Sequence, residues 1–137
     1  MDVVIDIGVG DCKVRSGSEG LLTAEFTYNV EEWSPEVEYS VTNGRGTLTI
    51  SQPDAEGVSA PSNARNEWVL EFSADVPLDI MLDMGVGDAK LDLGDLRLTD
   101  LDVDHGVGEL TVNLVGSGVA DLDGSIDGGV GQVRVMV

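Results

Sequence analysis

Four copies of the tripeptide Gly-Val-Gly, set in similar surroundings, constrain the fold of this chain more than any other feature. They stand at residues 8–10, 85–87, 106–108 and 129–131, and the last three begin 21 and 23 residues apart. The stretches around them read IDIGVGDCKV, LDMGVGDAKL, VDHGVGELTV and IDGGVGQVRV. Each runs apolar, Asp, any residue, Gly-Val-Gly, polar, small or apolar, polar, apolar. The match predicts one structural unit used repeatedly, with a period of about 22 residues.

Apolar and polar residues alternate on both sides of these glycines. Before the second copy, for example, Ile80, Leu82 and Met84 alternate with Asp79 and Asp83. This alternation is typical of β-strands with one buried face and one solvated face. No stretch shows a convincing helical period of about 3.6 residues, so we expect little or no helix.

A glycine between two short strands permits a tight bend or backbone angles that side chains forbid. We therefore predict an all-β, single-domain β-solenoid over residues 1–137, with Gly-Val-Gly corners and parallel coils stacked about 4.8 Å apart. In this prediction residues 78–137 form the regular repeats and residues 15–77 form less regular, wider coils. A β-sandwich is the alternative architecture.

Stacking would bring equivalent apolar residues of successive coils together in four inward rows. The expected rows are Ile5, Leu82, Val103 and Ile126; Val9, Val86, Val107 and Val130; Cys12, Ala89, Leu110 and Val133; and Val14, Leu91, Val112 and Val135. Both ends of the stack, at residues 3–7 and 133–137, look uncapped. Unpaired strand edges of this kind favour self-association.

The middle of the chain is less regular. Four stretches read as strands, at residues 21–30, 36–42, 46–51 and 67–74. The run Asn43-Gly44-Arg45-Gly46 predicts a turn between the second and third of them. The polar residues 52–66 predict the longest loop.

Length and composition limit what this architecture can do. A chain of 137 residues has room for one domain, and with 4% aromatic residues its core must be aliphatic. The net charge of −19 argues against partners that are themselves anionic, namely nucleic acids and acidic lipid surfaces. A single cysteine excludes an internal disulfide and a cysteine-rich zinc site. No apolar run approaches the roughly 20 residues of a membrane span, so we expect no direct membrane insertion.

We find no motif for an enzyme, a metal site or a cofactor. The sequence has no Gly-x-Ser-x-Gly, no His-Glu-x-x-His, no phosphate loop and no third glycine of a dinucleotide fingerprint. The pattern places His105 on the inward side of a corner and Cys12 in an inward row, so both are interpreted as structural. Trp33 and Trp68 could anchor a ligand, although packing is the simpler interpretation. We therefore predict a protein without catalytic, cofactor-binding or metal-binding residues.

Acidic residues recur at fixed places in the repeat. Asp6, Asp83, Asp104 and Asp127 lie two residues before the first glycine and should face outward, and a second row contains Asp11, Asp88, Glu109 and Gln132. At 4.8 Å adjacent carboxylates repel by roughly 0.9 kcal/mol in water and about 3.5 kcal/mol at an effective dielectric of 20. Lys13, Lys90 and Arg134, with Thr111 between them, form one cationic row that could relieve part of this repulsion. We interpret the acids as a solvated face with turn hydrogen bonds, and bound Ca²⁺ as the less favoured alternative.

The segment VPLDIMLDMGVGDAKLDLGDLRLTDLDVDHGVGELTVNL, at residues 76–114, resembles a bacterial family of unknown function, the toast-rack domain. The weaker GSIDGGVGQVRVMV (124–137), the N-terminal VVIDIGVGDCKV and the strand containing Trp68 are similar as well. The family is related to the "putative adhesin" families and to the cell-wall-active antibiotic response (LiaF-like) proteins. The resemblance implies a stacked-coil all-β fold and an extracytoplasmic, cell-envelope setting, and it implies no substrate. The chain opens without a signal peptide, so we expect it to be a trimmed form of a longer protein.

Taken together, these features predict a non-enzymatic module that binds another protein or assembles with itself. Adhesin-like binding of carbohydrate or Ca²⁺ is the first alternative. A polysaccharide-active enzyme would need an apolar or crowded cleft and aromatic platforms, for which the sequence offers little. Within the family resemblance, a regulatory role in envelope stress is a further alternative.

Overall fold

The computed structural model describes residues 1–17, 20, 22–28, 35–52, 66–115 and 123–136, and within these ranges it contains β-strands and no helix. The strands are β1 (Asp2–Val9), β2 (Asp11–Ser16), β3 (Leu22–Tyr28), β4 (Glu36–Thr42), β5 (Arg45–Ser51), β6 (Asn66–Phe72), β7 (Leu78–Val86), β8 (Ala89–Asp92), β9 (Leu98–Val107), β10 (Leu110–Asn113), β11 (Asp123–Val130) and β12 (Val133–Met136). The prediction of an all-β protein is confirmed.

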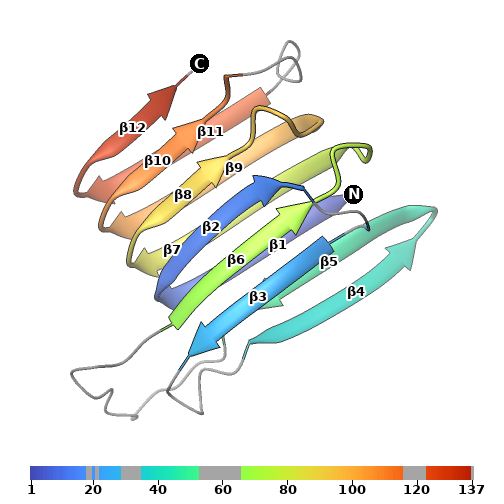
Figure 1. Ribbon diagram of the computed structural model, residues 1–137, viewed down its shortest axis with the longest axis horizontal. Helices are drawn as coiled ribbons and strands as arrows, with labels where there is room; N and C mark the ends of the chain where they lie inside the picture. Colours follow the sequence, from blue (N-terminus) through green and yellow to red (C-terminus); the bar gives the residue numbers. More distant parts are fainter. Residues whose placement is uncertain (18–19, 21, 29–34, 53–65, 116–122, 137) are drawn as a thin grey trace.

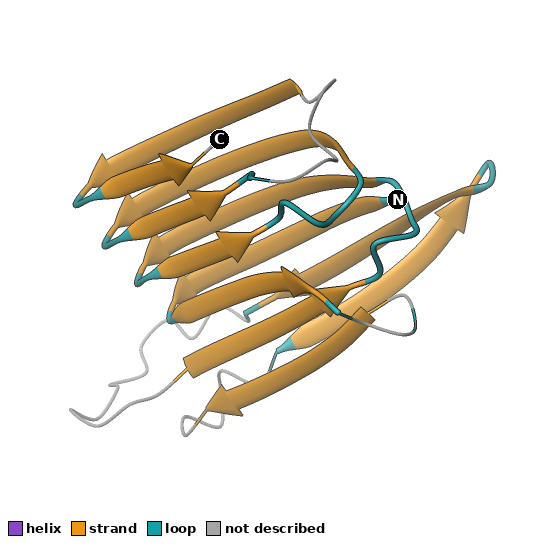
Figure 2. Cartoon of the chain, turned by 45° about the horizontal axis from the view of Figure 1, so that its top comes forward, coloured by secondary structure: helices purple, strands orange, loops and turns teal. Residues whose placement is uncertain are grey.

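These strands form two mixed sheets of six strands each (Figure 1). The first sheet has the order β11-β9-β7-β1-β5-β4, and the second has the order β12-β10-β8-β2-β6-β3. The two sheets lie face to face, and every strand of one has a counterpart in the other (Figure 2).

Each Gly-Val-Gly copy joins a strand of the first sheet to a strand of the second. We call each such strand–corner–strand unit a rung; the rungs are β1–β2, β7–β8, β9–β10 and β11–β12. Neighbouring strands pair in parallel, so that Val9 lies beside Val86, Val86 beside Val107 and Val107 beside Val130. The four turns therefore line up along one side of the molecule, the corner edge (Figure 2).

The second glycine of each corner cannot be replaced without strain. Gly87 has a φ of 139° and Gly108 a φ of 131°, in a region that L side chains rarely adopt. A Cβ on Gly87 would lie 1.7 Å from the carbonyl oxygen of Gly10, and one on Gly108 would lie 2.0 Å from that of Gly87. The close approach of backbones from adjacent rungs therefore demands glycine.

An aliphatic core fills the space between the sheets, as the low aromatic content predicts. Three of the expected inward rows are buried over the first three rungs: Ile5, Leu82 and Val103; Cys12, Ala89 and Leu110; Val14, Leu91 and Val112. Their equivalents in the last rung, Val133 and Val135, are 46% and 42% exposed because no described strand stacks beyond β12.

The fourth expected row is wrong. Val9, Val86, Val107 and Val130 are 47%, 48%, 47% and 70% exposed. The strand pairing passes from Ile7–Met84 directly to Val9–Val86 and omits the glycines between them. At the corner the inward–outward alternation therefore does not predict burial, and the four valines are exposed along the corner edge.

Two valines of β9 offer a matched test of this correction. Val103 is fully buried and Val107 is 47% exposed, so truncation to alanine should have very different costs. We expect Val103→Ala to lower the free energy of unfolding by about 2 kcal/mol and Val107→Ala by no more than about 0.5 kcal/mol. Urea unfolding followed by circular dichroism measures both values. Equal losses would contradict the exposed position of the corner valines.

The middle of the chain extends the stack and then closes it. β5 pairs in parallel with β1, and β6 pairs in parallel with β2. β1 and β2 are therefore interior strands, and the prediction of an uncapped start at residues 3–7 is wrong. At the other end, β12 is the outermost of the described strands of its sheet, as the prediction has it.

The outermost strands of this end run the other way. β3 pairs antiparallel with β6, and β4 pairs antiparallel with β5, so this part of residues 15–77 does not continue the parallel coils. The predicted turn is present between β4 and β5, where Asn43 and Gly44 have φ of 54° and 78°, as a two-residue hairpin turn requires. The predicted long loop lies mostly outside the described residues.

Candidate functional site

The outer surface of the first sheet is acidic. Asp6, Asp83, Asp104 and Asp127 are adjacent in the strand pairing and exposed, as the sequence predicts. Near the other end of the same strands, Asp2, Asp79 and Asp100 form a second row. We call this surface, which also includes Asp102, the acidic face.

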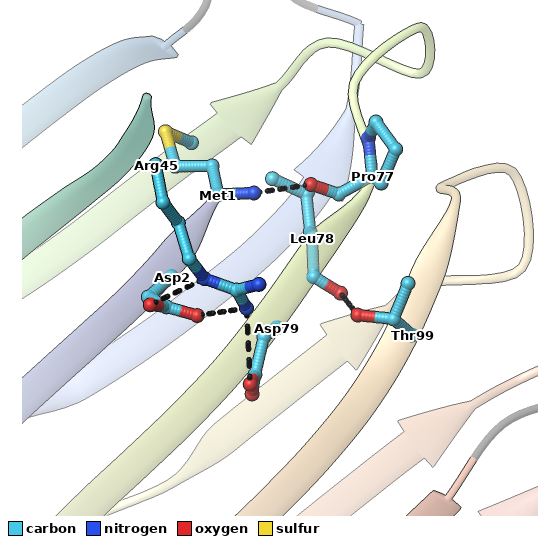
Figure 3. Close-up of polar contacts among 7 residues, drawn as sticks. All are labelled: Met1, Asp2, Arg45, Pro77, Leu78, Asp79 and Thr99. Carbon is cyan, nitrogen blue, oxygen red and sulfur yellow. Dashed lines mark hydrogen bonds and ion pairs between the residues drawn. The ribbon is translucent and has the colours of Figure 1, made fainter. Parts of the chain in front are cut away.

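Arg45 pairs with two carboxylates of the acidic face (Figure 3). Its Nε donates a hydrogen bond of 2.8 Å to Asp2 Oδ2, and its Nη2 donates a second one to Asp2 Oδ1. The same Nη2 lies 3.7 Å from Asp79 Oδ2. In the described part of the chain, Arg45 is the only cation that forms ion pairs with this face.

Carboxylates of the acidic face differ in pKa according to their neighbours. The hydrogen bond from Arg45 lowers the pKa of Asp2. Burial, assisted by the charge of Asp83, raises the pKa of Asp6. Burial also raises the pKa of Asp79, and Asp100 and Asp2 add to that effect. Protonation of Asp6 and Asp79 would therefore relieve the cost of burying their charges and, to a smaller extent, the repulsion from neighbouring carboxylates.

These shifts predict an unusual dependence of stability on pH. A carboxyl whose pKa is raised by folding takes up a proton on the folded protein first, so stability rises as pH falls through its folded pKa. Asp6 and Asp79 act in this direction, whereas Asp2, with a lowered pKa, contributes stability that is lost only below its usual value of 3.8. We expect the free energy of unfolding to increase from pH 7 towards roughly pH 4 and to fall below it.

Urea unfolding across this pH range tests the prediction, with Asp6→Asn as the control. The variant should be more stable than the native chain at pH 7, by less than about 1 kcal/mol because the site is largely solvated. Its free energy of unfolding should also increase less than that of the native chain when the pH is lowered. A steady loss of stability from pH 7 downwards, equal in both proteins, would contradict the assignment.

The outer surface of the second sheet carries a column of cations. Lys13 and Lys90 are direct neighbours in the strand pairing, and Thr111 and Arg134 continue the same row. We call these four residues the basic column. Beside it lies a shallow depression of about 270 Å³, lined by Asp11, Lys13, Asp88, Lys90, Glu109 and Thr111.

The acids beside the basic column bond to backbone amides. Asp11 Oδ1 accepts a hydrogen bond of 3.2 Å from the amide of Asp88, and Asp88 Oδ1 accepts one of 3.0 Å from the amide of Glu109. The sequence predicts such bonds within one turn, but these two connect one rung to the next. They therefore contribute to the alignment of the corners.

The acidic residues do not form a recognisable cation site. Among the described residues, no three His, Cys, Asp or Glu side chains are grouped so that they could hold a metal ion. Carboxylates that lie in a straight row at strand spacing present few oxygens to one point, whereas Ca²⁺ takes six to eight. We expect thermal unfolding to give the same midpoint in excess EDTA and in millimolar Ca²⁺. A rise of several degrees in Ca²⁺ alone would contradict this expectation.

The two residues with the most reactive side chains are buried. His105 is 1% exposed, and its Nε2 lies 2.8 Å from the carbonyl oxygen of Gly87 in the preceding rung. Cys12 is also 1% exposed, and burial raises the pKa of its thiol to about 12. Both positions are the inward ones that the repeat predicts. Neither side chain is accessible to a substrate in solution.

Trp68 packs inside the stack and does not line a surface site. It is buried, and its ring meets that of Phe26 edge-on at 5.3 Å. Its Nε1 donates a hydrogen bond of 2.9 Å to Asn66 Oδ1, and Asn66 Nδ2 donates one of 2.8 Å to the carbonyl of Val9. The packing interpretation is therefore confirmed for Trp68, and Trp33 lies outside the described residues.

Sequence reasoning missed the role of Arg45 and of Asn66. Arg45 was recognised only as part of a turn, since its partners are distant in sequence and meet it through the β5–β1–β7 order. Asn66 is the first residue of β6, just outside the strand expected at residues 67–74, and no repeat copy marks it. The only signal in the sequence is a polar residue two positions before Trp68, because its burial is not visible there.

Comparisons with known proteins agree with this architecture. A family model described as "N-terminal domain of toast_rack, DUF2154" matches residues 1–136. A crystal structure of a protein from Clostridium sporogenes, described as a "putative cell adhesion protein", is similar with a TM-score of 0.80 and 25% sequence identity, covering 98% of this chain and 91% of that one. No curated protein matches the chain. Among the described residues, no helix is long and apolar enough to cross a membrane.

Proposed function

Because the chain belongs to the family of toast-rack N-terminal domains, we propose that it is a non-enzymatic, adhesin-like module of the bacterial cell envelope that acts by binding other proteins. The observation that carries the proposal is the stack itself, which holds charged rows of opposite sign on two separate faces. Support also comes from the likeness to the adhesion protein of Clostridium sporogenes, which extends over nearly the whole chain.

The proposed architecture is a single-domain β-solenoid. Four rungs share one corner geometry, and the last three of them recur with a period of about 22 residues. Each rung buries its apolar face against its neighbours. Their side chains form continuous rows, so charges of one sign recur along the outer surfaces, as in the row of Asp6, Asp83, Asp104 and Asp127. Such flat, rigid and periodic faces suit contact with a partner protein better than they suit the enclosed pocket of an enzyme.

The absence of enzymatic activity is proposed from the placement of the reactive side chains. The side chains of His105 and Cys12 are buried in the core, and burial keeps the thiol of Cys12 protonated by raising its pKa. The carboxylates of the acidic face are spread in rows on an open sheet. General acid–base catalysis needs such groups within hydrogen-bond reach of one substrate atom, usually in a cleft.

The proposal is tested by measuring binding of the labelled chain to bacterial envelope preparations, before and after protease treatment. We expect saturable binding that protease removes. Lys13→Thr with Lys90→Thr gives a variant of the basic column with little structural effect, because Thr111 already occupies that row. Asp83→Ser with Asp102→Ser gives the matched variant of the acidic face, since Ser125 already occupies a place in one of its rows.

If a charged face meets the partner, one of the two variants should bind about tenfold more weakly or worse, and the other should bind normally. Binding that survives protease but is lost in EDTA would overturn the proposal in favour of a Ca²⁺-dependent carbohydrate ligand. Release of soluble fragments from envelope polymers would overturn it in favour of an enzyme.

A further inference from the structure

The last rung, β11–β12, forms one end of the stack that the structure describes. β11 and β12 are edge strands of their sheets, and both lie at the same end of the molecule (Figure 1). Val133 and Val135 of β12 are 46% and 42% exposed, although the residues that occupy their places in the preceding rung, Leu110 and Val112, are buried. This end therefore exposes apolar side chains together with two strand edges that no described strand covers.

The hydrogen-bonding groups of the two edges follow from the observed ladder. At the two ends of β12, the carbonyls of Gln132 and Met136 accept hydrogen bonds of 2.9 and 2.7 Å from the amides of Leu110 and Leu114 in the preceding rung. Because alternate residues of a strand direct their N–H and C=O groups to opposite sides, those of Val133 and Val135 point to the open edge.

The same reasoning applies to β11. In β1 the carbonyl of Asp6 accepts a bond from Gln52 on the β5 side, so outward residues of this sheet direct their backbone groups away from β11. Asp127 holds the place of Asp6 in the last rung, through the chain of paired positions. The backbone groups of Ile126 and Gly128 therefore point to the open edge of the stack.

We propose that a second copy of this chain docks on this end, with β11 of each copy pairing antiparallel with β12 of the other about a twofold axis parallel to the strands. This dimer proposal rests on the proposed protein-binding function and names a second copy of the chain as one partner. Ile126 would face Val135 of the second copy, and Gly128 would face its Val133. All four residues face inward, and their backbone groups point to the open edge. The pairing therefore forms backbone hydrogen bonds between the copies and also brings the inward side chains of the two copies together.

Charge complementarity selects this arrangement. In the same register Asp127 lies opposite Arg134 of the second copy, in a non-hydrogen-bonded pair, where side chains approach most closely. Both residues are exposed, and neither forms an ion pair with any residue that the structure describes. The alternative twofold axis, perpendicular to the sheets, would instead bring Asp127 against Asp127 and Arg134 against Arg134.

A head-to-tail chain of copies is less favourable. It would place β4 of one copy on β11 of the next, and the outward residues of β4 include Glu36 and Glu38. These would meet Asp127, so like charges would face each other across the edge. Such a contact also leaves both ends open and grows into a fibre, whereas the twofold pairing closes on itself.

Sedimentation velocity over a concentration series at physiological ionic strength tests the proposal, with amide hydrogen exchange as a second readout. We expect a monomer–dimer equilibrium and protection of the Ile126, Gly128, Val133 and Val135 amides that increases with concentration. Arg134→Glu should raise the dissociation constant by about tenfold or more. Lys90→Glu changes the net charge equally on an interior strand and should leave the constant within about threefold.

The double variant Asp127→Arg with Arg134→Glu reverses the pair and should restore dimerisation. A chain that stays monomeric at every concentration, with unprotected edge amides, would overturn the proposal. So would a dimer that Arg134→Glu leaves intact, or oligomers that grow without limit as concentration increases. The proposed function can fail separately, since a dimer that binds no envelope component would leave this inference standing.

Discussion

Replacing Gly87 with alanine is expected to lower the free energy of unfolding by about 3 kcal/mol or more, which is a large part of the stability of a domain this size. Two effects add at this position. The φ of 139° is strained for any L side chain, and the new methyl group would lie 1.7 Å from the carbonyl oxygen of Gly10. That oxygen belongs to a backbone in the middle of the stack, so it cannot move aside without separating two rungs.

Two further glycines separate these effects. Gly44 has a φ of 78° but open space around its Cβ position, so Gly44→Ala should cost only the strain, about 1 kcal/mol. A Cβ on Gly20 would have no atom of the described residues within 4 Å, and Gly20 has no positive φ, so Gly20→Ala should change stability by no more than about 0.5 kcal/mol. Urea unfolding of the three variants should give this order. Equal losses at Gly44 and Gly87 would show that the rungs do not press against each other at the corners.

The repeat predicted most of the regular stack because two independent signals agree within it. The glycine tripeptides mark the corners, and the alternation on either side marks which face each residue occupies. Cys12 and His105 were placed correctly inside by this reasoning alone, although neither residue type is characteristic of an aliphatic core. The acidic face and the basic column were also predictable, since parallel stacking converts a sequence repeat directly into a spatial row.

The predictions that were wrong concern places where apolar–polar alternation alone does not determine the structure. Alternation counted through the corner predicts that Val107 is buried, but Val107 lies beside the turn and is 47% exposed. The antiparallel course of β3 and β4 could not be read from alternation, which is the same for both strand directions. The position of β5 beside β1 depends on contacts between distant parts of the chain. Without it, neither the ion pairs of Arg45 with Asp2 and Asp79 nor the interior position of β1 could be predicted.

Trp68 gives the second prediction with a large expected effect. Trp68→Ala should lower the free energy of unfolding by about 3–5 kcal/mol, because it removes a fully buried ring and its edge-on contact with Phe26. Trp68→Phe retains most of the packing but leaves Asn66 Oδ1 without its donor, for a loss of about 1–3 kcal/mol. Asn66 also donates a hydrogen bond to the carbonyl of Val9, so part of this destabilisation should arise from weaker anchoring of the first corner.

Tyr39 is the matched control, because it is an aromatic residue on an edge strand and 53% exposed. Tyr39→Ala should cost less than about 1 kcal/mol. Urea unfolding gives the three stabilities, and envelope binding of the folded Trp68→Phe protein separates packing from recognition. A purely structural role requires that this variant bind as the native chain does. If Trp68→Ala instead kept full stability and lost envelope binding, the residue would be a ligand anchor and the two-sheet packing around it would have to be revised.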